Sequence, residues 1–190
     1  MNFFDRIIDS FSNPVTAIAQ IIGIFPFIIC SFMFLFDDRR KVLFYKMLSD
    51  ALSSLHLLLL GEMTGAALNL ISAIRGYVFS HKGKKWASGL HIPILFCCIN
   101  LLSTIMTWSG IKSLFPCVGS TLVIVGFWCN DIRLVRRINF CGIILWLIYG
   151  IMAGSISTIL STTFSATSVL TAEIKDRIKQ KKRALEIQQL

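Results

Sequence analysis

Polar side chains that could bind a small solute lie inside an otherwise apolar stretch, residues 43–79. Asp50 and His56 fall in its first half, and Asn69 falls in its second half. These side chains can donate or accept hydrogen bonds, and the carboxyl group can also carry a charge. At membrane depth such groups are costly to expose to lipid, so we expect them to face protein or a water-filled cavity.

Each of these groups has a structural alternative to solute binding. Asp50 either takes a proton or pairs with Lys46, one helical turn before it, and the spacing favours the ion pair. His56 is either a hydrogen-bonding pocket residue or a histidine whose partners lie in the core. Asn69 either binds a solute or bonds a neighbouring helix.

Two further groups of side chains lie near the end of the chain. Trp146 could stack on a ring-shaped solute or pack in the core, and Tyr149 could stack or anchor the membrane interface. The last apolar segment is rich in hydroxyl groups, which either line a polar cavity or bond their own helix backbone: Ser157, Thr158, Ser161, Thr162 and Ser165. Ser161, Ser165 and Ser168 share one helical face, which favours the cavity. The candidate substrate-binding residues are therefore Asn69, His56, Trp146, Thr158 and Ser161.

Two prolines, Pro26 and Pro116, lie within or near the start of apolar segments. Proline removes a backbone hydrogen bond, so each is either a hinge, a static kink or a helix start. The chain has no glycine-rich phosphate loop, no HExxH and no GxSxG. Its six cysteines fall in or at the ends of apolar segments without metal-ligand spacing. We expect no enzyme activity, catalytic residue, cofactor or metal.

The composition indicates an integral membrane protein. Apolar residues make up 55% of the chain and charged residues only 15%, against about 25% in soluble domains. The first apolar run, residues 14–36, is longer than a signal-peptide core of about 7–15 residues, so we interpret it as a mature helix. The net charge of +9 does not indicate nucleic-acid binding, because the basic residues lie in short loops and in the tail.

Seven apolar segments predict seven transmembrane helices, at about residues 14–36, 43–60, 64–80, 88–108, 113–130, 136–152 and 155–172. If the N-terminus is outside, the cytoplasmic loops and the tail hold 17 of the 19 lysines and arginines. Only Arg6 and Lys112 then lie outside. Positive residues in short loops set membrane orientation, so we expect an N-out, C-in topology.

Short patterns recur about 90 residues apart in the sequence. Phe25-Pro26 recurs at residues 115–116, the charged turn 37–41 recurs at 130–137, and the hairpin 55–65 recurs at 145–154. This alignment pairs Gly61 with Gly150, Gly65 with Gly154, and His56 with Trp146. Both charged turns fall on the cytoplasmic side, so the two three-helix units are parallel and one further crossing must join them.

The predicted architecture is therefore all-α with a 3+1+3 arrangement. The first three-helix unit is residues 1–80, the linker helix with its loops is 81–112, and the second unit is 113–172. Residues 173–190 form a basic cytoplasmic tail, which we expect to lie as a helix on anionic lipid headgroups. A disordered tail is the alternative.

The residues resemble a bacterial inner-membrane family, the YgjV type. The matching features are the basic turn at 37–41 and the motifs HLLLLG at 56–61, ALNLISAIR at 67–75, LFPCVGS at 114–120 and AGSIS at 153–157. The 3+1+3 pattern is also similar to the SWEET and PQ-loop sugar transporters. Their Pro-Gln signature is absent, since Phe27 follows Pro26 and Cys117 follows Pro116, and of their paired asparagines only Asn69 fits, with Thr158 near the second position.

The resemblance implies this fold and transport of a small solute. We expect a multi-pass protein of the bacterial inner (plasma) membrane, carrier-like, with a pocket between the two repeats. The alternative is a non-transporting assembly or regulatory protein with the same fold. The lipid bilayer is the expected partner. The sequence does not decide whether the protein also forms a homo-oligomer.

Overall fold

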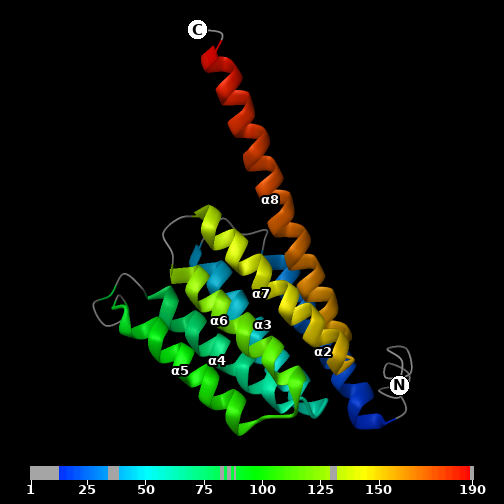
Figure 1. Cartoon of the computed structure of the whole chain (residues 1–190). Helices are drawn as coiled ribbons and strands as arrows, with labels where there is room; N and C mark the ends of the chain where they lie inside the picture. The colour runs from blue at the N-terminus through cyan, green and yellow to red at the C-terminus, as the bar shows by residue number, and fades with distance from the viewer. Residues whose placement is uncertain are drawn as a thin grey trace.

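The computed structural model describes residues 13–33, 39–81, 84, 87, 89–128 and 132–188, and these residues are helical apart from their turns (Figure 1). The described residues contain seven α-helices, one short 3-10 helix and no strand. The helices are α2 (Pro14–Met33), α3 (Arg39–Leu59), α4 (Met63–Ser80), α5 (His91–Met106), η2 (Ile111–Ser113), α6 (Leu114–Trp128), α7 (Ile132–Ala153) and α8 (Ile156–Gln188). Each predicted apolar segment coincides with one α-helix, and the all-α class is confirmed.

The helix ends follow local chemistry. Asn13 caps α2 through its side-chain oxygen, which accepts a hydrogen bond from the Val15 amide at 2.9 Å, and Pro14 takes the first helical position. α3 ends where Gly61 takes a φ of 77° and α7 ends where Gly154 takes a φ of 66°, a left-handed conformation that glycine adopts without steric cost.

The α3–α4 and α7–α8 turns have the same hydrogen-bond pattern. The amides of Gly61 and Glu62 bond the carbonyls of Leu58 and Leu57. The amides of Gly154 and Ser155 likewise bond the carbonyls of Ile151 and Gly150. The turns therefore correspond as Gly61 to Gly154, four residues away from the alignment of Gly61 with Gly150 that the sequence predicted. Gly65 and Gly150 both lie inside helices.

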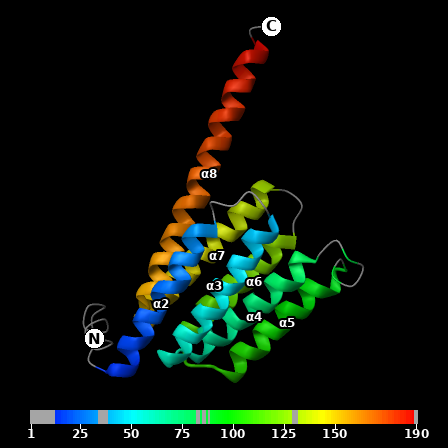
Figure 2. The ribbon, with the colours of Figure 1, turned by 180° about the vertical axis from the view of Figure 1, so that it is seen from behind.

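Six helices form a ring. Following contacts around it, α2 packs on α3, α3 on α4, α4 on α6, α6 on α7, α7 on α8, and α8 on α2, while α5 packs outside on α4 and α6. Figures 1 and 2 show α5 at one edge of the bundle and α2 with α8 at the other. α2, α4, α6 and α8 run in one direction and the remaining helices in the other, so the three-helix sets α2–α4 and α6–α8 have the same orientation.

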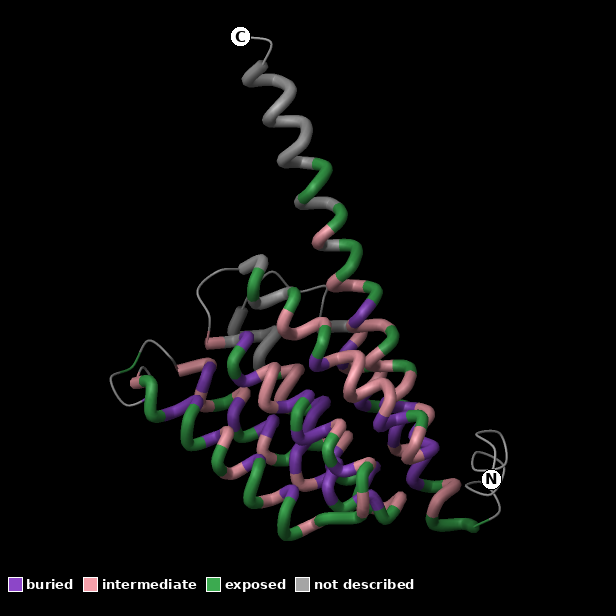
Figure 3. Tube along the Cα trace, viewed as in Figure 1, coloured by how far each residue is buried: buried purple, intermediate pink, exposed green. Residues whose placement is uncertain are grey.

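The outer surface of the bundle is apolar. Large hydrophobic side chains are more than half exposed on several helices, among them Phe25, Leu70 and Leu102, while buried residues face inward (Figure 3). α2 contains the one stretch among the described residues that is long and apolar enough to cross a membrane, Pro14–Ser31. His91–Met106, Ile111–Gly126 and Arg137–Ala153 are shorter apolar stretches. α3 and α4 contain charged residues, so they do not belong to these apolar stretches.

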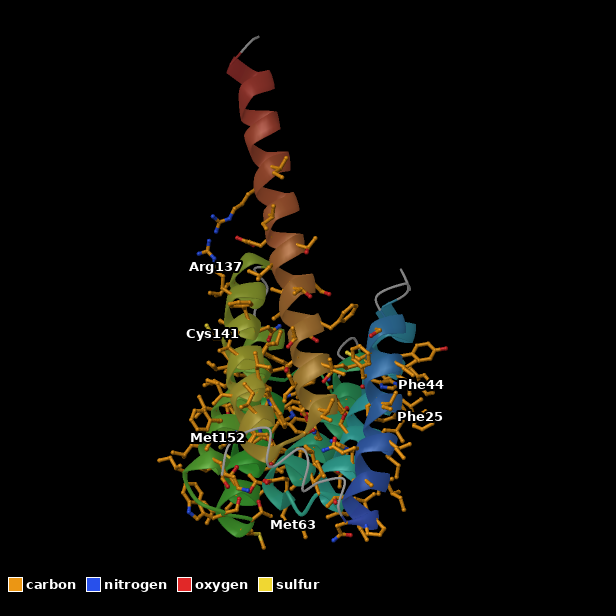
Figure 4. All side chains as sticks on the ribbon, turned by 90° about the vertical axis from the view of Figure 1, so that its right-hand side faces the viewer. Phe25, Phe44, Met63, Arg137, Cys141 and Met152 are labelled. Atoms are coloured by element: carbon orange, nitrogen blue, oxygen red, sulfur yellow. The ribbon has the colours of Figure 1, made fainter. Side chains whose placement is uncertain are left out.

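Lys46 and Arg75, which the topology argument counted among the basic residues of the cytoplasmic loops, lie inside helices. Lys46 belongs to α3, and Arg75 belongs to α4, which continues to Ser80. The predicted tail continues α8 without a break to Gln188 and projects beyond the bundle (Figure 1). Figure 4 shows Met63 and Met152 toward one end of the bundle and Arg137 toward the other, beside the projecting α8. The basic turn at 37–41, Lys82 and Gly83 fall wholly or partly outside the described residues.

Candidate functional site

A cavity of about 280 Å³ lies inside the ring of helices. Side chains of all six ring helices line it, and most of them are polar: Cys30, Lys46, Ser49, Asp50, Ser53, Asn69, Ser72, Arg75, Ser120, Val123, Asn139, Ile143, Trp146, Thr158, Ser161, Thr162, Ser165 and Val169. A cavity with polar side chains in its wall can hold water or a small polar solute, whereas purely apolar cavities stay dry.

Four of the five candidate binding residues lie in the cavity wall: Asn69, Trp146, Thr158 and Ser161. They come from α4, α7 and α8, so the ring closure brings together residues from both halves of the chain. Asn69 is buried, and its amide makes no hydrogen bond to another described residue. That amide is therefore available to a solute in the cavity.

Hydroxyl groups of α8 both line the cavity and bond their own helix backbone, which were the two alternatives that the sequence left open. Ser161 and Thr162 line the cavity, yet each donates its proton to the Thr158 carbonyl, at 3.2 and 2.6 Å. Their oxygens keep lone pairs that can accept hydrogen bonds from a solute. Ser165 also lines the cavity, whereas Ser168 donates to Phe164 at 2.9 Å and lies outside the wall.

Three charged side chains line the cavity. Lys46 and Asp50 form the ion pair that their spacing predicted. The Asp50 side chain is 9% exposed and the Lys46 side chain 39% exposed, so Lys46 links the cavity to the surface. Arg75 is the third charge, and the sequence argument missed it because it counted Arg75 only among the cytoplasmic basic residues. Helical spacing is the signal that could have found it, because Asn69, Ser72 and Arg75 lie three residues apart on one face of α4.

Arg75 is buried and has few partners. Among the described residues its one hydrogen bond runs from Nη1 to the Ser120 carbonyl, at 3.5 Å. Two further groups in the same wall, Ser120 Oγ and Asn139 Oδ1, are buried without any hydrogen-bond partner in the described structure. Buried polar atoms normally have partners, so these orphans indicate that the cavity binds water or a ligand at this point.

His56 lies outside the cavity wall, so of its two alternatives the structure favours a histidine whose partners lie in the core over a pocket residue. Its side chain is fully buried, with Nδ1 2.7 Å from the Ala19 carbonyl and Nε2 2.7 Å from Ser155 Oγ. A carbonyl oxygen only accepts, so Nδ1 is the protonated nitrogen in the neutral ring. Ser155 Oγ is also 2.7 Å from Thr158 Oγ1. His56 therefore joins α2 and α3 to the start of α8, next to a wall residue.

A second polar cluster, formed by Tyr149, Glu62 and Lys112, lies next to Trp146. Tyr149 is fully buried and donates a hydrogen bond to Glu62 Oε2 at 3.2 Å, while Lys112 Nζ is 2.6 Å from Glu62 Oε1. The Tyr149 ring packs edge-to-face on Trp146, with centroids 5.7 Å apart. The full burial of Tyr149 disfavours the interface anchor, one of the two alternatives that the sequence left open. It holds α7 against the α3–α4 turn instead.

The prolines take different positions. Pro26 lies in the middle of α2, and its carbonyl accepts a hydrogen bond from Ser49 Oγ at 2.9 Å. Pro116 is the third residue of α6, where proline costs little because the first amides of a helix lack partners. This position favours the helix-start interpretation for Pro116. In the part of the chain that the structure describes, no group of three or more His, Cys, Asp or Glu side chains is placed to hold a metal ion.

These features define a helical membrane protein with an apolar surface and a polar internal cavity. The chain belongs to the bacterial inner membrane protein family Imp-YgjV, whose family model matches residues 17–180. It is thus a multi-pass protein of the bacterial inner membrane. Comparisons with curated proteins and with solved structures found no match. The expected similarity to SWEET and PQ-loop transporters is not shown by these comparisons.

Proposed function

We propose that this protein is a carrier for a small polar solute, which binds in the cavity between the α3–α4 and α7–α8 hairpins. The observation that carries the proposal is the cavity inside the ring, which is lined by Asn69 and Arg75 of α4 and by Thr158 and Ser161 of α8. Solute sites near the midplane, at an interface between two repeated units, are the usual arrangement in secondary carriers.

The proposal includes the 3+1+3 repeat, and two reciprocal contacts support it. His56 contacts Ser155, the turn residue of the other hairpin, and Tyr149 contacts Glu62, the turn residue of the first hairpin. Glu62 and Ser155 follow the two corresponding glycines of the turns. Each hairpin thus contacts the turn of the other. Such reciprocal contacts are expected when a pseudo-two-fold axis parallel to the helices relates two hairpins of the same orientation. In this scheme α5 is the linker crossing, and the topology is N-out, C-in.

Carriers expose a site alternately to the two sides of the membrane. In this structure the Tyr149–Glu62–Lys112 cluster closes the end of the bundle that we assign to the outside. Lys46, partly exposed, lies toward the end that we assign to the cytoplasm. The structure thus corresponds to an inward-facing or occluded state in this proposal. Pro26 is the candidate hinge, because its missing amide proton removes a hydrogen bond in the middle of α2.

Uptake into proteoliposomes tests the carrier proposal. Purified protein is incorporated into vesicles, and uptake of a set of labelled small polar solutes is compared with empty vesicles. Asn69→Leu should abolish the uptake, because the free amide is lost from the cavity wall. Leu70→Ile, an exposed neighbour on α4, is the matched control and should transport normally. Absence of uptake for every solute class would favour the alternative, an assembly or regulatory protein, for which the projecting α8 offers a surface.

A further inference from the structure

We propose that Arg75 is the anchor of an oxyanion site, so that the solute of this cavity is a small carboxylate or phosphate. This inference rests on the proposed function, because it names the chemical class of the solute that the cavity binds. It follows from three features of the described wall: an arginine that forms no ion pair with a described residue, two polar atoms without hydrogen-bond partners, and one more positive than negative side chain.

The guanidinium of Arg75 has five N–H donors, and its one recorded acceptor among the described residues is the Ser120 carbonyl, at the long distance of 3.5 Å. Arg75 forms no ion pair with a described residue. A charge at membrane depth is costly unless it is paired or hydrated. The planar fork of arginine fits the two oxygens of a carboxylate or phosphate, which would satisfy the donors that the protein leaves free.

Other polar atoms of the cavity wall complete the site. Ser120 is 2% exposed, and its Oγ has no hydrogen-bond partner. Its hydroxyl can donate to an oxyanion while Arg75 contacts the carbonyl of the same residue. Asn139 Oδ1 is also orphaned, and Asn69 carries a free amide. These two amides can bind hydroxyl groups elsewhere on the solute.

The charge balance selects an anion over a neutral or cationic solute. Lys46 and Asp50 lie in the same wall but neutralise each other through their ion pair. Among the described side chains of the wall, Arg75 therefore leaves one positive charge in excess. A cation would be repelled by it, and a neutral polyol would leave the guanidinium without a counter-ion. A small anion gives a site with no net charge.

Calorimetric titration of the purified full-length protein in lipid nanodiscs tests the assignment. The probes are malate, inorganic phosphate, the neutral four-carbon polyol erythritol and the four-carbon dication putrescine. Malate or phosphate should bind, and neither erythritol nor putrescine should bind. Phosphate binding without malate binding would identify inorganic phosphate as the source of the oxyanion, and malate binding would identify an organic acid.

Arg75→Gln should weaken oxyanion binding about ten- to hundred-fold, the range expected for losing a hydrogen bond to a charged group. The affinity of Arg75→Lys for the oxyanion should lie between those of the wild type and Arg75→Gln, since lysine keeps the charge but loses the planar fork. Arg177→Gln, at an exposed arginine on α8, is the charge-matched control and should bind normally. The melting temperature of ligand-free Arg75→Gln should stay level or rise, because an unpaired buried charge is removed.

Two results that involve Arg75→Gln would overturn the oxyanion site. One is a lower melting temperature of Arg75→Gln with unchanged affinity for malate and phosphate, which would make Arg75 a structural residue. The other is binding of erythritol, but of neither anion, with equal affinity in the wild type and Arg75→Gln. This second result would leave the carrier proposal intact. Failure of both anions to bind would also remove the assignment, whereas the carrier proposal falls only if the uptake experiment fails.

Discussion

Tyr149 and Glu62 are hydrogen-bonded across the ring, with 3.2 Å between the phenol oxygen and Oε2, although 87 residues separate them in the sequence. The same phenol oxygen accepts a hydrogen bond from the Gly65 amide at 3.1 Å. That amide is one of the first four of α4, which lack partners within their own helix. A single side chain of α7 thus satisfies the start of α4 and holds the turn before it. Gly65 allows this contact, because a Cβ there would lie 2.6 Å from Tyr149 Cε1.

We expect Tyr149→Phe to destabilise the protein. The variant keeps the ring packing on Trp146 but leaves the Gly65 amide without an acceptor and removes one partner of Glu62. An unsatisfied buried group costs about 1–3 kcal/mol. The melting temperature in detergent measures the loss. Tyr77→Phe, at an exposed tyrosine, is the control, and an equal loss in both variants would contradict the role of this hydrogen bond.

His56→Leu and Asn69→Leu should have different effects, although the sequence placed both residues in one pocket. His56→Leu removes both hydrogen bonds of a fully buried ring, so it should lower the melting temperature. Asn69→Leu removes no hydrogen bond within the described structure, so it should abolish solute binding and leave stability nearly unchanged. Thermal unfolding with and without solute separates the two effects. Equal destabilisation by both variants would contradict the assignment of Asn69 to the cavity.

Gly154→Ala should destabilise the α7–α8 turn by about 1 kcal/mol, because alanine is strained at a positive φ. Gly76→Ala is the matched control. Gly76 lies inside α4, and a Cβ there meets only Met47 at 3.8 Å, so alanine should be neutral or stabilising by up to about 1 kcal/mol. The melting temperature of Gly154→Ala should fall, whereas that of Gly76→Ala should stay level or rise. A drop in both would contradict the role of backbone conformation at Gly154.

Single cysteines in a cysteine-free background test the N-out, C-in topology. Cysteine at Met63, exposed at the α3–α4 turn, should react with an impermeant thiol reagent added to intact cells. Cysteine at Leu134, exposed near the start of α7 at the other end, should react only after the membrane is opened. The turn glycine Gly154 is unsuitable because of its positive φ. Labelling of position 134 in intact cells would reverse the assigned orientation.

The basic end of α8 should bind anionic lipid. Each lysine or arginine near an anionic surface contributes about 1 kcal/mol, so replacing Lys181 and Lys182 by glutamine should weaken binding measurably. Cosedimentation of the detergent-free full-length protein is not informative here, because the bundle itself inserts into vesicles. A synthetic peptide of residues 173–190 should instead bind anionic vesicles more strongly than neutral ones at physiological salt, and the double-glutamine peptide should bind less. Equal binding to both vesicle types would remove the electrostatic contribution.

Hydropathy and the residues that begin and end helices determined the local structure from the sequence alone. Long apolar runs separated by glycine, asparagine and charged residues predicted seven helices in nearly their observed places, because apolar length and helix ends are local properties. Local spacing also predicted the Lys46–Asp50 ion pair, since residues four apart lie on one helix face. The same motifs indicated the family that the comparison confirmed.

Only the tertiary structure decided which polar side chains share a cavity. His56 and Asn69 are alike in a linear reading, yet helix packing buries His56 against Ala19 and Ser155 and directs Asn69 into the cavity. A linear reading counts Arg75 among the cytoplasmic basic residues, whereas helix packing buries its side chain in the cavity wall. The register of the two turns was likewise set by backbone conformation at Gly61 and Gly154, which short sequence matches cannot distinguish from neighbouring glycines. Rotation and contact of helices depend on residues far apart in the chain, so no local pattern contains them.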